Sequence, residues 1–274
     1  MPEGGKSRRG EEILLSKGFI PILNYHQITD KDLMNDPYAV SVSKFERQMN
    51  YNYEHGYQCL SLIDVLRIIE KSPTQLKKTF VLTFDDGYAD FYKNAYPILQ
   101  RNGFTATVFI VTDYVGKESQ WEGGRGNPLL NWDEIKALHK AGVFFGSHTC
   151  THPRLTQISS DRILYELKAS KEKLEAELGE EIQFLAYPYG ESSSEIQRIA
   201  KDLGYIAAFG VNTGRNGRFN LWRSLCLTHD SLLRYTFRLS PWYHSLKLLR
   251  RWIREETALG KFLCQIKQRL LSNP

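Results

Sequence analysis

The chain has 274 residues, of which 42% are hydrophobic and 24% charged, and its formal net charge is +5. This length is enough for one large α/β domain or two smaller ones, and no apolar run approaches the roughly 18 residues that a membrane span requires. The four cysteines form no C-x-x-C pair, which excludes a zinc ribbon and gives no sign of a disulfide framework. The sequence also lacks the basic and aromatic repeats and the finger spacing of nucleic-acid readers, so we expect no nucleic acid partner.

Residues 1–18 form a polar, basic lead rather than the apolar core of a signal peptide. We therefore expect the protein in the cytoplasm or on the cytoplasmic face of the membrane, and outside the cell if an export signal precedes this sequence. From residue 19 onward, short runs rich in β-branched and aromatic residues alternate with amphipathic segments, most of which end at a glycine. We expect strands at 19–25, 79–84, 105–111, 143–146, 182–186, 205–209 and 224–228, and helices at 43–54 (capped by Ser43), 62–70, 90–101, 133–140, 160–178 and 194–203.

Strands separated by helices of ten or more residues favour parallel βα units. In such a fold the carboxyl ends of the strands converge on one face, where active sites form. The motif TFDDG places Asp85 and Asp86 directly after a buried strand. The motif SHTCTHP places His148 and His152 after a later, short strand. A long Gly-rich connection at 115–134 is expected to lie on the same side.

The two adjacent carboxylates require positive charge nearby, because like charges repel and neither is easily buried alone. Two histidines four residues apart suit two ligands of one metal, and Pro153 favours a single turn or loop around them. Asp86 with both histidines would form a His₂Asp set with open positions, suited to zinc or another divalent ion. Asp85 would then stay free to act as a base. The alternatives are an Asp-Gly turn cap and two surface or capping histidines.

Together the motifs TFDDG, SHTCTH and YPYG resemble the polysaccharide deacetylase (NodB-homology, carbohydrate esterase) family in order and spacing, over roughly residues 19–229. The resemblance implies a distorted, incomplete (β/α) barrel of about seven parallel strands, forming a catalytic domain at 19–233. It also implies a metal-dependent hydrolase that removes N-acetyl or O-acetyl groups from a sugar or polysaccharide. Its cofactor would be one divalent ion, zinc in the first place and otherwise cobalt, nickel or manganese.

The resemblance assigns roles residue by residue. It makes Asp85 the catalytic base and makes Asp86, His148 and His152 the metal ligands. Ala186 stands where many family members have an arginine that holds the catalytic aspartate. The resulting AYPYG form resembles the branch that includes biofilm poly-N-acetylglucosamine deacetylases, in which an arginine follows later in the chain. Arg223 is the matching candidate, with a surface or phosphate-facing arginine as the alternative.

Two histidines are candidates for the acid that protonates the leaving amine. PILNYHQITD resembles the start of the domain in the same branch and nominates His26, whereas LCLTHD resembles the usual C-terminal motif and nominates His229. We favour His26, because the third motif already departs from the usual form. By resemblance the substrate contacts are Tyr187, Pro188, Tyr189 and Trp222, with the Tyr189 N–H in the oxyanion hole. The tyrosines and Trp222 could instead be core aromatics.

Residues 234–274 carry nine Lys and Arg against two Glu, mixed with Trp, Leu and Phe. This composition suits a basic amphipathic extension in peripheral contact with a membrane, or simply a solvated helix face. The extension keeps open a second function, the deacetylation of a lipid-linked or nucleotide-linked aminosugar during glycan assembly. A non-catalytic carbohydrate-binding relative is the remaining alternative, and the intact set of two Asp and two His argues against it.

Overall fold

The computed structural model describes residues 20–31, 36–71, 78–211, 217–243 and 245–246. The chain divides into two compact units, one that ends at Asp230 and one that begins at Ser231. The second unit contains helix α8 (Leu232–Arg238). The lead predicted at 1–18 lies outside the described residues, and so do residues 244 and 247–274 of the extension predicted at 234–274. Within the described part of the chain, no helix is long and apolar enough to cross a membrane.

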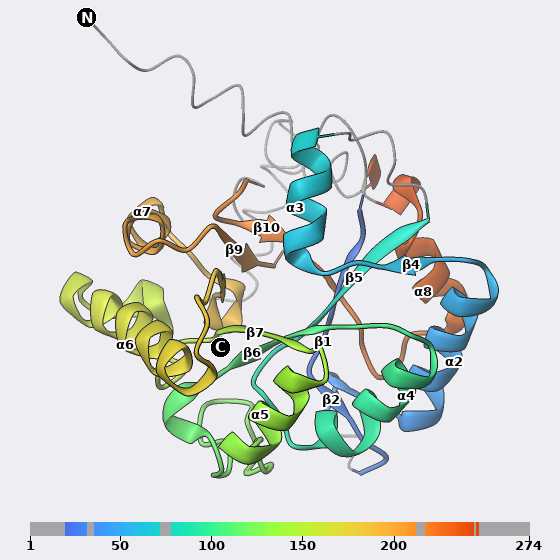
Figure 1. Cartoon of the computed structure of the whole chain (residues 1–274), viewed down its shortest axis with the longest axis horizontal. Coiled ribbons are helices and arrows are strands. Elements are labelled where there is room, and N and C mark those ends of the chain that lie inside the picture. Colours follow the sequence, from blue (N-terminus) through green and yellow to red (C-terminus); the bar gives the residue numbers. More distant parts are fainter. Residues whose placement is uncertain (1–19, 32–35, 72–77, 212–216, 244, 247–274) are drawn as a thin grey trace, which may run out of the picture. The chain divides into compact units, whose positions relative to one another are not determined.

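The first unit is built on a parallel sheet that is nearly closed into a barrel, with helices around it (Figure 1). The described sheet has nine strands. Their spatial order is β10 (Leu221–Trp222), β9 (Ala207–Gly210), β8 (Phe184–Ala186), β7 (Phe144–Ser147), β6 (Thr107–Ile110), β5 (Thr79–Phe84), β1 (Ile22–Tyr25) and β11 (Ser224–Leu225), and β4 (Gln58–Cys59) also pairs with β5. A separate pair joins β2 (Gln27–Ile28) to β3 (Ala39–Val40).

The two end strands of this sheet, β10 and β11, are separated in the chain by a single residue, Arg223. The strand β10 pairs with β9, whereas β11 pairs with β1 on the other side of the barrel. The chain therefore crosses the seam of the barrel at Arg223. Arg223 belongs to neither strand, so strand pairing does not fix its position. Its side chain is nevertheless buried.

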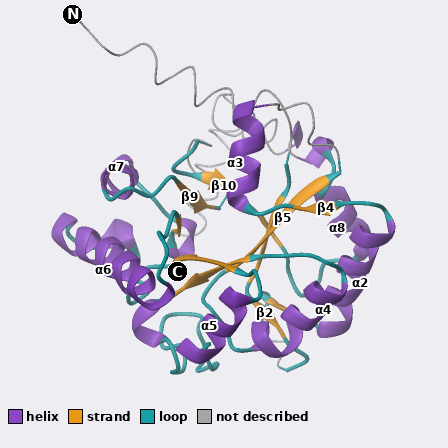
Figure 2. Ribbon diagram, in the orientation of Figure 1, coloured by secondary structure: helices purple, strands orange, loops and turns teal. Residues whose placement is uncertain are grey.

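Helices follow most of the strands and lie around the outside of the sheet (Figure 2). They are α2 (Val42–Glu54), α3 (Leu62–Lys71), α4 (Tyr96–Arg101), α5 (Trp132–Lys140), α6 (Ser160–Leu178) and α7 (Ser194–Asp202), with 3₁₀ turns η3 (Thr112–Tyr114), η4 (Leu155–Gln157) and η5 (Pro188–Gly190). Serine or asparagine side chains accept hydrogen bonds from the first turns of α2, α5, α6 and α7, which satisfies amide groups that have no partner within the helix.

Every predicted strand and helix has a counterpart, with three differences. Four strands of two residues each, β2, β3, β4 and β10, are additional to the seven predicted. The cap of α2 is Ser41, whose side chain accepts from the Lys44 amide, and not the predicted Ser43. The segment predicted as one helix at 90–101 begins as a π-helix, η2 (Phe91–Ala95). Pro97 follows in the first turn of α4 and lacks the amide hydrogen that a continuous α-helix would use there.

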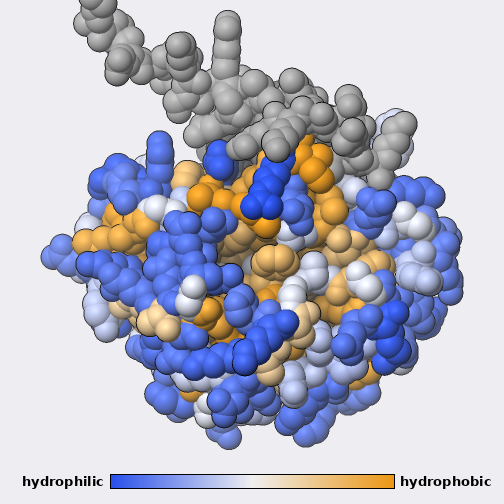
Figure 3. Space-filling view, viewed as in Figure 1, coloured by the Kyte–Doolittle hydropathy of each residue, from blue (hydrophilic) through white to orange (hydrophobic). Residues whose placement is uncertain are grey.

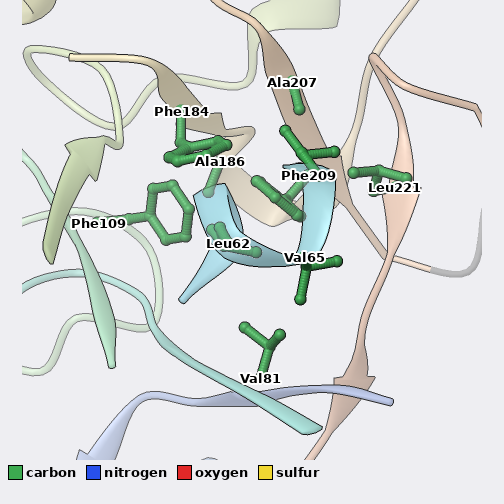
Figure 4. Packing of buried hydrophobic residues seen from close by; sticks show 10 residues of the cluster. Leu62, Val65, Val81, Phe109, Phe184, Ala186, Ala207, Phe209 and Leu221 are labelled. Carbon is green, nitrogen blue, oxygen red and sulfur yellow. The ribbon is translucent and has the colours of Figure 1, made fainter. Parts of the chain in front are cut away.

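Helix α3 closes the amino end of the barrel. Its residues Leu62, Val65 and Leu66 are buried against side chains from the strands, including Phe109 and Phe209 (Figure 4). On the face seen in Figure 3, hydrophobic residues gather toward the centre and hydrophilic residues cover most of the periphery. The apolar packing at this end leaves the opposite, carboxyl end of the strands for polar side chains.

Candidate active site

A cavity of about 130 Å³ opens among the carboxyl ends of the strands. Its wall includes Asp85 and Asp86, which follow β5, and His148, which follows β7. His152 and Arg223 also line it. Residues that are up to 138 positions apart in the sequence therefore meet in one place, as the convergence of parallel strand ends predicts.

Three side chains in this cavity point their ligand atoms at one another. Asp86 Oδ1 lies 3.4 Å from His148 Nε2 and 3.4 Å from His152 Nε2. The three ligand atoms all lie within 4.8 Å of one another, and all three residues are buried. One carboxylate oxygen and two imidazole nitrogens that converge in this way are a donor set suited to a borderline divalent ion.

The imidazole of His148 is oriented by the main chain of the third motif. Its Nδ1 lies 2.8 Å from the carbonyl oxygen of Ala186, so that Nδ1 must carry the hydrogen and donate it. In the neutral ring the lone pair of Nε2 then faces Asp86, the arrangement that metal-binding histidines adopt when a carbonyl fixes the ring. The ring of His152 is held differently, by stacking on Trp121 with 4.7 Å between ring centroids. The residues present therefore fit a divalent ion.

The backbone at the cavity adopts conformations that side chains other than glycine rarely take. The φ angles are +74° at Asp86, +70° at Thr149, +59° at His152 and +58° at Tyr189. Such left-handed residues persist only where surrounding contacts hold them, and they cluster at functional sites. The loop that carries the two histidines is therefore not the helical turn that would place i and i+4 on one face. It brings them together by a different, strained route.

The second carboxylate, Asp85, lies outside the histidine cluster and forms a buried two-pronged ion pair. Arg223 Nη1 lies 2.6 Å from Asp85 Oδ1, and Arg223 Nη2 lies 2.7 Å from Oδ2. Asn24 donates to the same Oδ2 at 3.0 Å, and Arg223 Nη1 also donates to Asn24 Oδ1 at 2.9 Å. Parallel pairing of β1 with β5 sets Asn24 beside Thr83, whose hydroxyl donates to the same Asn24 oxygen at 2.9 Å.

Both carboxylates are held in the ionised form by their neighbours. Burial alone would raise the pKa of Asp85, but the charges of Arg223 and His148 and the hydrogen bonds from Arg223 bring it below its usual value. Burial also opposes ionisation of Asp86, but the hydrogen bonds that His148 and His152 donate to it when their rings are protonated hold its pKa well below the usual range. The two adjacent acids therefore differ in their main partner, which is Arg223 for Asp85 and the histidine pair for Asp86.

The family model described as polysaccharide deacetylase matches residues 72–208. The structure of the Streptococcus pyogenes deacetylase PplD in complex with acetate is 31% identical to this chain, with a TM-score of 0.72 over 81% of this chain and 98% of that one. The chain belongs to the polysaccharide deacetylase family. The predicted family, the class of enzyme that it represents and the barrel fold are thereby confirmed.

Two curated relatives are more distant in sequence. The Staphylococcus aureus poly-beta-1,6-N-acetyl-D-glucosamine N-deacetylase is 27% identical over 210 residues, which are 69% of this chain and 71% of that protein. The Bacillus subtilis protein YxkH is 27% identical over 194 residues, which are 71% of this chain and 64% of that protein. This chain therefore spans somewhat less than two thirds of YxkH.

The two candidate acids lie in different environments. His26 follows β1, lines the cavity and is close enough to both carboxylates to favour their ionisation. Its Nδ1 is buried without a hydrogen-bond partner among the described residues, and its ring lies 4.9 Å from that of Tyr38. His229 is exposed and is not among the residues that line the cavity. Of the two, only His26 is in place to meet a group bound there.

The predicted substrate contacts also differ in whether they line the cavity. Tyr187 and Tyr189 line the cavity, whereas Pro188 and Trp222 are not among its lining residues. The ring of Tyr189 packs edge-on against His152 at 4.8 Å. The Tyr187 hydroxyl donates to the carbonyl of Phe219 at 2.9 Å and is therefore already engaged.

Several residues of the cavity were not predicted. Trp121 comes from the Gly-rich connection, which was predicted to face the site, but no pattern distinguished this tryptophan from its neighbours. Asn24 is the polar residue of an otherwise apolar strand, and that contrast was the available signal. Tyr88 hydrogen-bonds Asp86, and its pKa is raised by burial first and then by the charge and hydrogen bond of Asp86. Its position three residues after TFD gave no hint of this contact.

Proposed function

We propose that the protein is a metal-dependent deacetylase that hydrolyses N-acetyl (or O-acetyl) groups on a sugar or polysaccharide. The observation that carries this proposal is that the two adjacent acids have different partners. Asp86 converges with His148 and His152 on one point, whereas Asp85 is bound by Arg223 and stays out of that cluster. A ligand and a base side by side are what hydrolysis by activated water requires.

Asp86, His148 and His152 would hold the ion, with zinc as our first choice and cobalt, nickel or manganese as alternatives. When bound, the ion lowers the pKa of water and polarises an acyl carbonyl. The open side of a three-ligand set is the feature that distinguishes catalytic from structural zinc sites. Burial of all three ligands also strengthens the electrostatic interactions of anything bound between them.

The remaining residues handle the protons and the developing charge. Asp85 accepts the proton of the attacking water, and its low pKa and its fixed position both come from Arg223. The backbone N–H of Tyr189 is proposed to donate to the oxyanion. His26 is proposed to protonate the departing amine, because it lines the cavity and His229 does not. Trp121 and Tyr187 form walls of the cavity against which the acyl group would pack.

The relatives support an N-acetylated glucosamine polymer as the substrate. One of them is named for deacetylation of poly-β-1,6-N-acetylglucosamine, and another, PplD, is a deacetylase whose structure was solved in complex with acetate. Acetate is the acid that such a reaction releases. A lipid-linked or nucleotide-linked aminosugar is the second candidate, favoured by the basic and apolar composition of residues 234–274.

The test is acetate release by the full chain, stripped of metal and then reloaded with zinc, cobalt, nickel or manganese. The substrates are poly-β-1,6-N-acetylglucosamine oligomers, acetylated chito-oligosaccharides, peptidoglycan fragments, xylan and lipid-linked and nucleotide-linked aminosugars. We expect release from an N-acetylglucosamine polymer that depends on the added ion. A protein that cannot be loaded with any of these ions, and that only binds the sugars, would establish the non-catalytic alternative.

A further inference from the structure

The loop that carries the two histidines is fastened to helix α6 by one buried carboxylate. Glu166 is fully buried in the middle of α6. Its Oε2 accepts the backbone N–H groups of Cys150 at 2.8 Å and of Thr151 at 2.9 Å. Its Oε1 accepts the hydroxyl of Thr151 at 2.6 Å. Both backbone donors lie between His148 and His152 in the sequence.

The charge of Glu166 is satisfied in this position. Arg162, one turn earlier on α6, donates from Nη2 to Oε1 at 2.6 Å. The carboxylate thus receives four donors, and charge-assisted hydrogen bonds of this kind are stronger than neutral ones. A buried carboxylate with this many donors is costly to remove, since each donor would be left without its acceptor.

The loop needs such an anchor because it has no regular hydrogen-bonding pattern of its own. Thr149 and His152 both adopt positive φ, a conformation that costs residues other than glycine about 1 kcal/mol or more and persists only when other contacts fix it. The Thr149 hydroxyl accepts the N–H of His152 at 3.0 Å. Glu166 fixes the two residues that lie between these strained positions.

Helix α6 supports the start of the loop as well. Ser170, one turn after Glu166, is fully buried and lies 2.6 Å from the hydroxyl of Ser147. Ser147 in turn accepts the N–H of Thr149 at 3.2 Å. One face of α6 therefore fixes the backbone on both sides of His148, and Glu166 contributes most of the contacts.

We infer that Glu166 is a positioning residue of the metal site. It holds the backbone between the two histidines so that both Nε2 atoms face Asp86. Its carboxylate bonds Cys150, Thr151 and Arg162 and, among the described residues, none of the three ligands. The inference rests on the proposed function, because it concerns the affinity of the Asp86, His148 and His152 set for its ion. Its role lies in where its acceptor oxygens are, not in its charge.

The test compares variants of Glu166 in the full chain by their affinity for zinc alone, measured by competition with a chelating indicator. Glu166→Ala removes every acceptor and is expected to bind zinc about 10–100-fold more weakly, the range for residues that orient metal ligands. Glu166→Gln is expected to recover most of the affinity, because its amide oxygen can take the place of Oε2 opposite the two backbone donors. Glu166→Asp keeps the charge but is one methylene shorter, so it should bind more weakly than Glu166→Gln.

Lys171→Met is the matched control on the same helix. Lys171 is also buried, but it donates to the carbonyl of Ile182 and to Glu175, away from the histidine loop. This variant is expected to lower the melting temperature of the metal-free protein with no change in zinc affinity. The absorption spectrum of the cobalt-loaded protein gives a second readout, which should change for Glu166→Ala and not for Lys171→Met.

Three outcomes are informative. A folded Glu166→Ala protein that binds zinc as tightly as the wild type overturns the inference. So does an affinity that is higher for Glu166→Asp than for Glu166→Gln, since charge and not position would then matter, and this ranking remains measurable if Glu166→Ala fails to fold. A wild-type chain that binds no zinc overturns the proposed function itself, which separates the two failures.

Discussion

At the amino end of the barrel, Leu62 and Val65 of α3 pack against apolar side chains, whereas at the carboxyl end Asp85, Arg223 and Asn24 form a buried hydrogen-bonded network. The two regions meet at the middle of the barrel. There the guanidinium of Arg223 lies 5.5 Å from the ring centre of Phe109, which also belongs to the apolar cluster.

The two ends of the barrel differ in what a substitution does to the protein. Apolar packing depends on volume, so a substitution at the amino end leaves a cavity and costs stability in proportion to it. The polar end depends on matched partners, so removing one group leaves another buried and unsatisfied. We therefore expect variants of the first kind to affect stability alone, and variants of the second kind to affect stability, ionisation and activity together.

The largest effect is expected for His26, which lines the cavity at the carboxyl end of the barrel. His26→Asn should lower kcat by about 10²–10⁴-fold, the contribution of a positioned acid, with zinc affinity unchanged. His229→Asn is the control and should stay within about twofold of the wild type, because His229 is exposed and outside the cavity. Steady-state kinetics of acetate release measure both. A strong loss in the His229 variant alone would reverse the assignment of the acid.

Arg223→Met removes the cation from the hydrogen-bonded network at the carboxyl end. It leaves the Asp85 carboxylate buried without its cation, and removing one partner of a buried ion pair costs about 3–5 kcal/mol. Urea unfolding at pH 7 measures this loss. The pKa of Asp85 should also rise, because burial then acts with less opposition. A variant as stable as the wild type would show that the pair contributes nothing net.

Leu62→Ala tests the apolar end. Leu62 is buried in the cluster under α3, and truncation of a buried leucine to alanine costs about 2–5 kcal/mol. The folded variant should bind zinc and release acetate as the wild type does. Urea unfolding and zinc competition on the same sample give both values. A matching loss of zinc affinity would mean that the two ends are coupled and that the comparison fails.

Asn24→Ala is expected to have the smallest effect, a change in how stability and kcat/KM depend on pH. The pKa of Asp85 is lower in the folded than in the unfolded chain, so the unfolded chain takes up a proton first as pH falls. Stability from this group is thus present above about pH 4 and is lost as pH falls through the folded pKa. Without the Asn24 donor the folded pKa should lie closer to the unfolded value, so that less stability is lost and the loss is complete at a higher pH.

The same variant should move the acid limb of kcat/KM upward by about one pH unit, which corresponds to 1.4 kcal/mol of lost stabilisation of the ionised form. Asn102→Ala is a suitable control, since Asn102 caps the C-terminus of α4, where its side-chain amide donates to the Ile98 carbonyl, and it is not among the residues that line the cavity. An acid limb that is identical in the wild type and in Asn24→Ala would remove Asn24 from the account of the base.

The sequence predicted the parts of this molecule that depend on local pattern. The strand before Asp85 and the helix at 160–178 follow from β-branched runs, apolar spacing and a closing glycine, and the structure has both with the predicted bounds. Parallel strand ends then predicted that Asp86, His148 and His152 would meet. Their approach within 4.8 Å is the result of that topology.

The parts that could not be predicted depend on contacts between distant segments. Arg223 could be nominated only by resemblance, since its place at the seam between β10 and β11 has no local signature. Glu166 reads as one more acid on an amphipathic helix, and only the fold shows that its carboxylate is buried beneath the histidine loop. The predicted cellular location and the membrane contact of residues 234–274 stay predictions.

The central claim is that the two adjacent acids have different jobs, and Asp85→Asn tests it most directly. Zinc content by mass spectrometry and acetate release are measured on the same preparation, with His148→Ala alongside. We predict that Asp85→Asn keeps its zinc and loses acetate release by at least about 100-fold, as expected for the loss of a general base, whereas His148→Ala loses both. Near-normal acetate release by Asp85→Asn, or loss of zinc together with activity, would contradict the account.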